Sequence, residues 1–271
     1  IRGKAGPYRA SDVCFLAFWF WCALSLTMVH DLDFAMQPAG NLFVETLGAY
    51  FLARCTIRNA DDFFRMARLL FGIVLVLFPF ALVEANTGAK PLLDLFGSVL
   101  PTIAPTSMAP RLGLWRVQGP FEHSILFGAF CGGLLALVHI VLGEARGAWR
   151  WAMTSIVALT ACLSLSAGAM TGLAVQLALL AWNGLLQKNE ARWRILFCLL
   201  FGMYLFVAIG SNQSVPSFYI SRFSFDQQSA GFRLLIWQYG SAAALDHFWF
   251  GSGFNEWSRP LWMPSSIDMF W

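Results

Sequence analysis

The stretch LLFGIVLVLFPFALV, from Leu69 to Val83, decides the fold class. It contains no charged residue, and its one proline, Pro79, lies near its end. An apolar run of this kind is typical of a transmembrane helix, which needs roughly 20 predominantly apolar residues. Six similar runs flank it, and the predicted spans lie near residues 13–29, 41–57, 69–83, 121–142, 151–165, 169–186 and 195–210. We therefore expect an all-α integral membrane protein with about seven transmembrane helices.

Two of these runs have competing interpretations. The 41–57 run is the weakest, because Glu45 and Arg54 interrupt it. The 13–29 run follows a basic amino-terminal region and so resembles a signal peptide as well as a span. The length of the run, its Trp and Phe content, and the lack of a small-residue cleavage site favour a span.

The composition agrees with a membrane protein. Apolar residues make up 58% of the chain and charged residues 12%, against about 45–50% and 25% in soluble domains. The net charge of +3 is spread over the loops, so nucleic acid is not an expected partner. The six cysteines fall in or beside apolar runs, and the four histidines are scattered. We therefore expect no disulfide framework, no metal site and no cofactor.

Positive charge predicts the orientation. With seven spans and a cytoplasmic amino end, the cytoplasmic connections hold 12 Lys and Arg residues and the opposite side holds 6. The positive-inside rule favours this arrangement. It divides the chain into a helical bundle, residues 1–211, and a long periplasmic loop, residues 212–271. The chain begins at Ile1 without Met and stops at Trp271 in mid-pattern, so we expect a piece of a longer protein.

A proline-rich stretch, 84–120, precedes the fourth span and cannot form one continuous helix; a short interfacial helix near Pro91–Leu100 is expected. The stretch ends in Arg116-Val-Gln-Gly-Pro-Phe-Glu-His123, named the re-entry segment below. Charged groups at the mouth of a span usually face a cavity or the interface. In the functional interpretation Arg116 binds an anionic headgroup while Glu122 or His123 handles a proton. In the alternative, Arg116 snorkels at the interface and His123 is satisfied by a backbone carbonyl.

The long loop carries the second group of candidates. A helix, predicted to be amphipathic, opens near Arg233 and runs toward Leu245, and a turn-like Gly251-Ser-Gly253 follows it. The functional interpretation makes Arg222 and Arg233 phosphate ligands and places His247 near the reacting hydroxyl. The alternative is a folded cap with solvated charges. Two further patterns, Gly128–Gly132 and Gly168–Gly172, favour close helix packing and are interpreted as structural.

In four places the chain resembles the bacterial O-antigen ligase and O-antigen/exopolysaccharide polymerase family of membrane glycosyltransferases. The re-entry segment is similar to that family's Arg-x-x-Gly-x-Phe-x-His/Asn motif. Ser164-Leu-Ser-Ala-Gly-Ala169 is similar to its tight turn between two spans. Arg233-Leu-Leu-Ile-Trp237 with Phe250-Gly-Ser-Gly253 resembles its outer-loop signature, and Ser265-Ser-Ile-Asp-Met-Phe-Trp271 resembles its entry to a further span.

Two positions depart from the family pattern. Ala167 stands where an Arg is common, so no charged role carries over to the turn. Ile267-Asp268 replaces a frequent His-Asn, which makes Asp268 a candidate general base beside His247.

The resemblance implies transfer of a glycan from an undecaprenyl-diphosphate-linked oligosaccharide to a glycan acceptor, at the outer face of the bacterial inner membrane. It suggests Arg116, Arg222 and Arg233 as diphosphate ligands without a metal, and His247 or Asp268 as base. Polysaccharide-export proteins are possible partners. Two rival functions remain, a transporter or flippase for lipid-linked glycans and a structural partner of an export complex. The absence of a transporter-type internal repeat disfavours the first.

Overall fold

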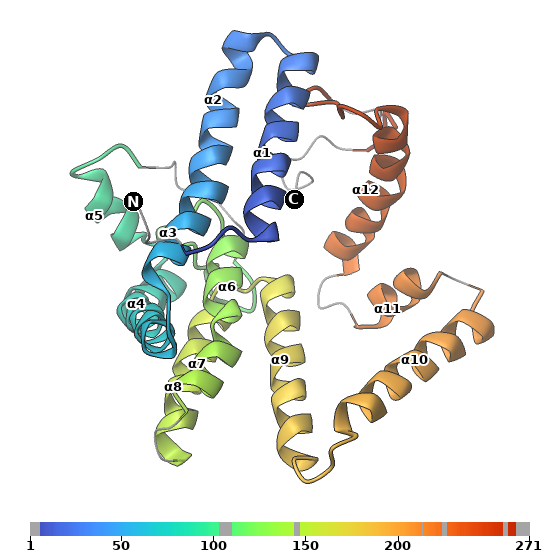
Figure 1. Ribbon diagram of the computed structural model, residues 1–271. Helices are drawn as coiled ribbons and strands as arrows, with labels where there is room; N and C mark the ends of the chain where they lie inside the picture. Colours follow the sequence, from blue (N-terminus) through green and yellow to red (C-terminus); the bar gives the residue numbers. More distant parts are fainter. Residues whose placement is uncertain are drawn as a thin grey trace. The chain divides into compact units, whose positions relative to one another are not determined.

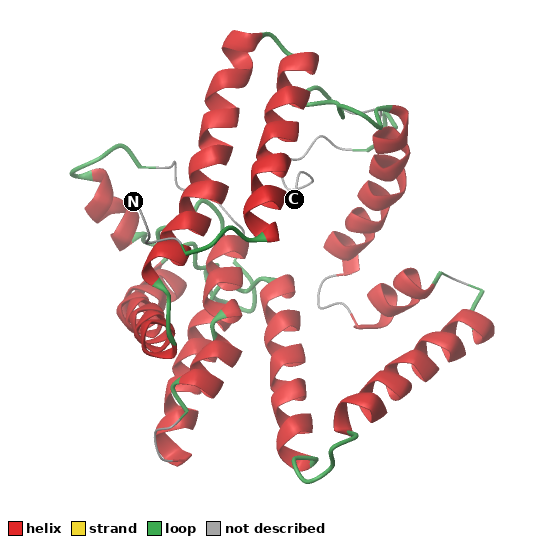
Figure 2. Ribbon diagram, in the orientation of Figure 1, coloured by secondary structure: helices red, strands yellow, loops and turns green. Residues whose placement is uncertain are grey.

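The computed structural model describes residues 6–102, 110–143, 147–212, 214–223, 227–256 and 260–263. Over these ranges the regular secondary structure is helical, without a strand (Figure 2). The chain divides into two compact units. The first unit joins Ile1–Asp62 to Gln227–Trp271, and the second is Phe63–Asp226.

The first unit is built on a helical hairpin. Helix α1 (Ala10–Val29) turns into α2 (Leu32–Leu42), which continues through the π-helical turn η1 (Phe43–Gly48) into α3 (Ala49–Thr56). Figure 1 shows α1 and α2 side by side. At the start of α1, the buried Asp12 forms an ion pair with Arg54, and the Tyr50 hydroxyl donates to the same carboxylate at 2.7 Å. These contacts fix α3 beside the amino-terminal end of α1.

Residues of the long loop close the other end of the hairpin. The Ser25 hydroxyl donates to the carbonyl of Phe250, and the backbone N–H of Phe254 donates to His30 Nε2 at 2.9 Å. Gly253 has a φ of +58°, and a Cβ there would lie 2.5 Å from the His30 ring. A glycine is therefore needed where the loop meets α1. The unit also contains α12 (Gln227–Asp246), which confirms the helix predicted near Arg233, although its apolar residues do not gather on one face.

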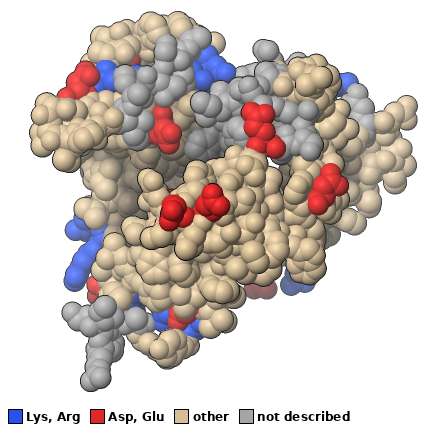
Figure 3. All heavy atoms as spheres, turned by 90° about the horizontal axis from the view of Figure 1, so that it is seen from above, with Lys and Arg blue, Asp and Glu red and all other residues tan. Residues whose placement is uncertain are grey.

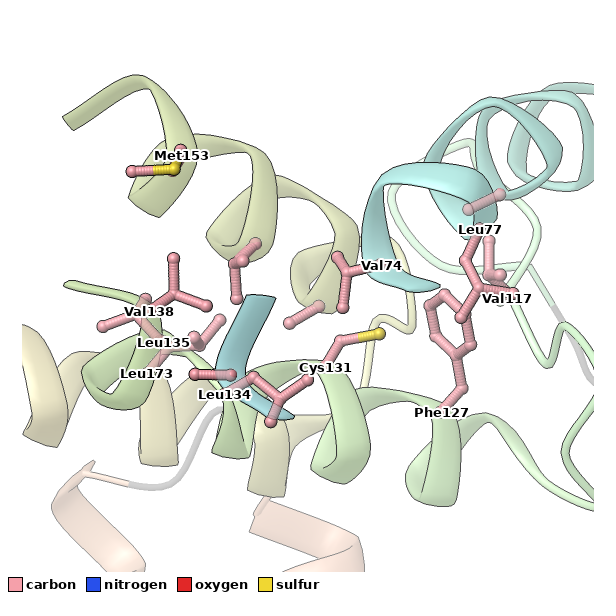
Figure 4. Packing of buried hydrophobic residues seen from close by; sticks show 14 of the residues in the cluster. Val74, Leu77, Val117, Phe127, Cys131, Leu134, Leu135, Val138, Met153 and Leu173 are labelled. Atoms are coloured by element: carbon pink, nitrogen blue, oxygen red, sulfur yellow. The ribbon is translucent and has the colours of Figure 1, made fainter. Parts of the chain in front are cut away.

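The second unit holds the main hydrophobic core. Its helices are α4 (Ala60–Thr87), α5 (Pro91–Gly97), α6 (Ser124–Gly133), α7 (Leu135–Val141), α8 (Gly147–Cys162), α9 (Ala167–Leu185), α10 (Arg192–Gly210) and α11 (Val215–Phe223). Figure 4 shows Val74 and Leu77 of α4, Phe127 and Cys131 of α6, and Val117 of the re-entry segment in one cluster. The core therefore ties the re-entry segment to the helices on both sides of it.

Close packing around α6 depends on glycine. A Cβ added at Gly128 would collide with Ser164 Oγ and lie 2.7 Å from Ala169 Cβ. The small residue therefore lets α6 approach the turn between α8 and α9, which confirms the structural interpretation of Gly128. The chain breaks helicity between α6 and α7, and Gln176 of α9 spans the break. Its side chain accepts from Ala136 N at 3.0 Å and donates to Gly132 O at 2.9 Å.

Five helices of the described chain are long and apolar enough to cross a membrane: Ala10–Val29, Ala60–Thr87, Ser124–Val141, Ala167–Leu185 and Arg192–Gly210. The predicted 41–57 and 151–165 spans are helical but are not among them, so the count of seven is not confirmed. Polar residues such as Asn41 and Glu45 lower the apolarity of the first, and α8 has only 16 residues. The re-entry span begins at Ser124 rather than at Phe121, because the motif itself forms a loop.

The surface agrees with a membrane environment. Large apolar side chains are exposed along α10, including Phe197, Phe206 and Ile209. On the face drawn in Figure 3, uncharged residues predominate and charged residues are scattered. A soluble monomer rarely exposes so much contiguous apolar surface, and lipid tails would cover it in a bilayer.

Candidate functional site

A buried carboxylate at the end of α4 organises the re-entry segment. Glu84 is only 3% exposed. Its Oε1 accepts the backbone N–H of Gln118 at 2.8 Å, and its Oε2 accepts that of Gly119 at 3.0 Å. Hydrogen bonds to a charged acceptor are stronger than neutral ones. Glu84 therefore fixes the loop at the residues that follow Arg116 and Val117.

Backbone contacts hold the segment on either side of Arg116. Trp115 N donates to the carbonyl of Ala85 at 2.9 Å, and Val117 N donates to that of Leu163 at 3.1 Å. Arg111 Nη1 donates to Leu165 O at 3.3 Å. The re-entry segment is thus attached both to α4 and to the turn between α8 and α9. Two of the sequence motifs, far apart along the chain, are brought together here.

Gly119 lets the segment turn sharply into α6. Its φ is +58°, and an added Cβ would lie 2.9 Å from the ring of Phe127. Both the left-handed backbone and the close ring exclude a side chain. The Gly in this motif is therefore required by geometry, and it places the following Glu122 and His123 at the start of α6.

Lys90 brings a positive charge to the same place. Its Nζ donates to the side-chain Oε1 of Gln118 at 2.6 Å, and Gln118 Nε2 donates to the carbonyl of Glu122 at 2.9 Å. Burial lowers the pKa of Lys90, and the Glu84 carboxylate partly opposes this shift. Lys90 and Glu84 thus interact electrostatically beside the re-entry segment.

The three residues predicted on this segment have different settings. Arg116 is half-buried and Glu122 is exposed. His123 is the N-cap of α6, since its Nδ1 accepts the backbone N–H of Ile125 at 3.1 Å. This contact gives His123 a structural role, through a backbone amide and not through the predicted carbonyl, because capping satisfies an amide that the helix leaves without an internal partner. Arg116 and Glu122 remain the candidates for substrate contact.

The predicted loop residues lie on or directly after other helices. Arg222, on α11, is exposed, and its guanidinium lies 5.6 Å from the ring centroid of Phe218. Arg233 and His247 belong to the first unit and are exposed. His247 Nδ1 lies 3.2 Å from the carbonyl of Ala243. Asp268 lies outside the described residues.

Sequence reasoning missed Glu84 and Lys90. Glu84 ends an apolar run, where a charged residue is ordinarily a solvated helix terminus. Its partner Gln118 is 34 positions away, so local periodicity could not indicate the contact. The one available signal was an acid and a base on either side of a tight turn ahead of Pro91.

An apolar groove lies beside the re-entry segment, within the second unit. Its volume is about 840 Å³, and its wall comes from α4, from Leu92 and Phe96 of the α5 helix, and from Pro120. Ligand sites usually measure about 300–1,000 Å³. Arg65 and Arg68 also line it. Among the described residues, no group of three or more His, Cys, Asp or Glu could hold a metal ion.

Membrane-length helices and a charged segment held at the mouth of one of them define a multi-pass membrane protein with a candidate site at the membrane boundary. Residues 151–269 match the model of the O-antigen ligase family. Over that region the chain is similar to the O-antigen ligases. Comparison with curated proteins and with solved structures gives no match.

Proposed function

We propose that the protein transfers a glycan from an undecaprenyl-diphosphate-linked donor to a glycan acceptor at the outer face of the bacterial inner membrane. The observation that carries the proposal is the family match over residues 151–269. The match includes the predicted phosphate ligands Arg222 and Arg233 and both candidate bases. No observation favours a flippase or a purely structural partner over transfer.

The reaction needs no redox partner. An acceptor hydroxyl oxygen attacks the anomeric carbon of the donor and forms the new glycosidic bond. The bond from that carbon to the diphosphate oxygen breaks, and its electron pair leaves with the lipid diphosphate. The hydroxyl proton passes to a base, His247 or Asp268. Catalysis therefore requires positive charge where the diphosphate develops its negative charge.

The geometry of the re-entry segment supports a role in donor binding. The backbone N–H groups of the residues on either side of Arg116 donate to carbonyls of neighbouring elements. Lys90 contacts Gln118 of the same segment. Arg111 contacts Leu165 in the turn between α8 and α9. We assign Arg116 to the diphosphate, with Arg222 and Arg233 as further ligands from the loop. The adjacent apolar groove suits the polyprenyl chain, because nearly all of its wall is hydrocarbon.

A genetic experiment tests the proposal in the source organism. The full-length gene is deleted and complemented with wild type, Arg116→Ala or Arg233→Ala, and the chain length of surface and secreted polysaccharide is measured. Arg194→Ala is the control, because Arg194 is exposed at the start of α10. We expect deletion to leave single lipid-linked repeat units or unattached chains. Both site variants should fail to rescue at normal membrane levels, and the control should rescue fully. Unchanged polysaccharide in the deletion strain would refute the proposal.

A further inference from the structure

A second groove, separate from the re-entry segment, lies within the first unit. This open groove has a volume of about 560 Å³ and lies between Leu26 of α1, one side of α2 and η1, and Phe254 of the long loop. Its distinctive lining residues are Gln37, Asn41 and Glu45. These three residues belong to α2 and η1, which return along α1 (Figure 1). Helix α1 is long and apolar enough to cross a membrane.

The three residues form a continuous polar stripe. They are spaced four apart, which places them on the same side of a helix. The π-helical turn η1 begins at Phe43, and its wider turn holds one more residue than an α-helical turn. This widening keeps Glu45 closer to the line of Gln37 and Asn41 than an α-helix would. Single π turns inside α-helices often occur at functional sites.

The stripe is exposed, and its side chains make no hydrogen bond within the described chain. Gln37, Asn41 and Glu45 are each exposed, and the hydrogen bonds of the described residues do not include their side chains. The hydrogen-bond donors and acceptors of these three side chains are therefore available to a polar occupant of the groove.

Aromatic rings flank the polar stripe. Phe34 and Phe254 lie 5.9 Å apart between centroids, edge to face, and His30 lies 4.7 Å from Phe34. The bond from Phe254 N to His30 Nε2 anchors the loop ring in place. Both phenylalanines are more than half exposed, so their faces are available to a ligand.

Flat apolar rings beside amides and a carboxylate match the chemistry of a sugar. The C–H face of a pyranose packs on an aromatic ring, while its hydroxyls both donate and accept hydrogen bonds. Gln and Asn offer both functions, and Glu accepts. The Glu45 charge would repel an acidic sugar and favours a neutral or amino sugar beside it.

We propose that this groove binds a sugar unit of the glycan acceptor. The inference rests on the proposed glycan transfer and adds an acceptor-binding site to it. The groove lies toward the end of α1 that the long loop contacts, which the predicted orientation places on the outer side. Water alone and a lipid chain are the competing occupants.

Direct binding tests the site without the donor. Full-length protein in lipid nanodiscs is titrated with the repeat-unit oligosaccharide released from the source strain's own polysaccharide, using isothermal titration calorimetry. Asn41→Leu removes one amide from the groove. Asn183→Leu is the matched control, because Asn183 is also an exposed amide on a membrane-length helix, α9. One lost hydrogen bond weakens binding about two- to tenfold.

We expect Asn41→Leu to raise the Kd by that factor and Phe254→Ala to raise it further, with Asn183→Leu unchanged. In a transfer assay, Asn41→Leu should raise the acceptor KM and leave kcat and the donor KM within twofold. A Kd equal to that of the wild type in both groove variants would overturn the proposal. The proposal would also be overturned if the wild-type protein did not bind the oligosaccharide. Wild-type transfer with an unchanged acceptor KM in Asn41→Leu would refute the groove alone. Oligosaccharide binding without any transfer would refute the proposed function and leave the groove.

Discussion

Glu84 accepts the backbone amides of Gln118 and Gly119 on its two carboxylate oxygens, at 2.8 and 3.0 Å. This relationship explains how a loop of irregular backbone is held at the mouth of a membrane helix. The carboxylate supplies the acceptors that a regular helix would supply from its own carbonyls. Arg116 is positioned as a result, since it lies two residues before the first of these amides.

Replacing Glu84 with Gln should loosen the re-entry segment. The amide nitrogen would face one of the two backbone N–H donors, so one charge-assisted bond becomes a donor–donor contact. We expect a loss of about 2 kcal/mol in stability and a corresponding loss of transfer. The measurement is the thermal unfolding midpoint of detergent-solubilised protein. Glu190→Gln, at an exposed position, is the control; equal shifts in both variants would contradict the assignment.

Gly119→Ala should destabilise the protein for a different reason. A left-handed backbone costs a residue with a Cβ about 1–2 kcal/mol, and the new methyl would press on the Phe127 ring. Gly184→Ala, inside α9 with no heavy atom within 4 Å of the added carbon, should gain up to about 1 kcal/mol from helix propensity. Opposite shifts in the unfolding midpoint are expected, and stabilisation by both would show that the turn at Gly119 is wrong.

The pH dependence of stability should carry a signature of Lys90. Burial lowers its pKa below the ordinary value of 10.5 in the folded state, so the unfolded chain binds more protons in the alkaline window below that value. Stability therefore rises with pH through this window, relative to a residue that does not titrate. The unfolding midpoint of wild type minus that of Lys90→Met should increase from about pH 8 to pH 10. A constant difference would mean that folding leaves the pKa of Lys90 unchanged, and a falling difference that folding raises it; either result would contradict the assignment.

The apolar groove predicts selectivity for the donor's lipid chain. Gly72 of α4 lines it, and nothing lies within 4 Å of a Cβ there, so Gly72→Leu should fill the groove without disturbing the fold. Losing burial of roughly two methylenes corresponds to an increase in donor KM of about tenfold. A donor with a short polyprenyl chain should be affected less. Gly202→Leu on α10 serves as control, and equal effects on long and short donors would exclude the groove as the lipid site.

Much of the fold could be predicted from the sequence, because a transmembrane helix requires a long run of apolar residues. Five of the predicted spans coincide with helices that are long and apolar enough to cross a membrane, and the short helix at Pro91 and the tight turn after α8 are also present. The span containing Asn41 and Glu45 was the uncertain one, since its polar residues break the apolar pattern. Those residues line the second groove. The same polar side chains therefore weaken the prediction of a span and contribute to the candidate site.

The candidate site was predicted only in part. Arg116, Glu122 and His123 were found because they form one short motif. Glu84 and Lys90 were not found, because their role depends on a loop that folds back onto α4 from 34 residues away. The N-cap role of His123 could not be predicted either, because the sequence does not show that α6 begins at Ser124.

Transfer by the purified protein tests the central claim most directly. Full-length protein in liposomes is given an undecaprenyl-diphosphate-linked repeat unit with a radiolabelled glycan, together with an unlabelled acceptor glycan and no nucleotide. We predict label in a longer glycan and release of undecaprenyl diphosphate in equal amounts, with both lost in Arg116→Ala and retained in Arg194→Ala. A donor that stays intact, or that crosses the bilayer without cleavage of its sugar–phosphate bond, would contradict the account.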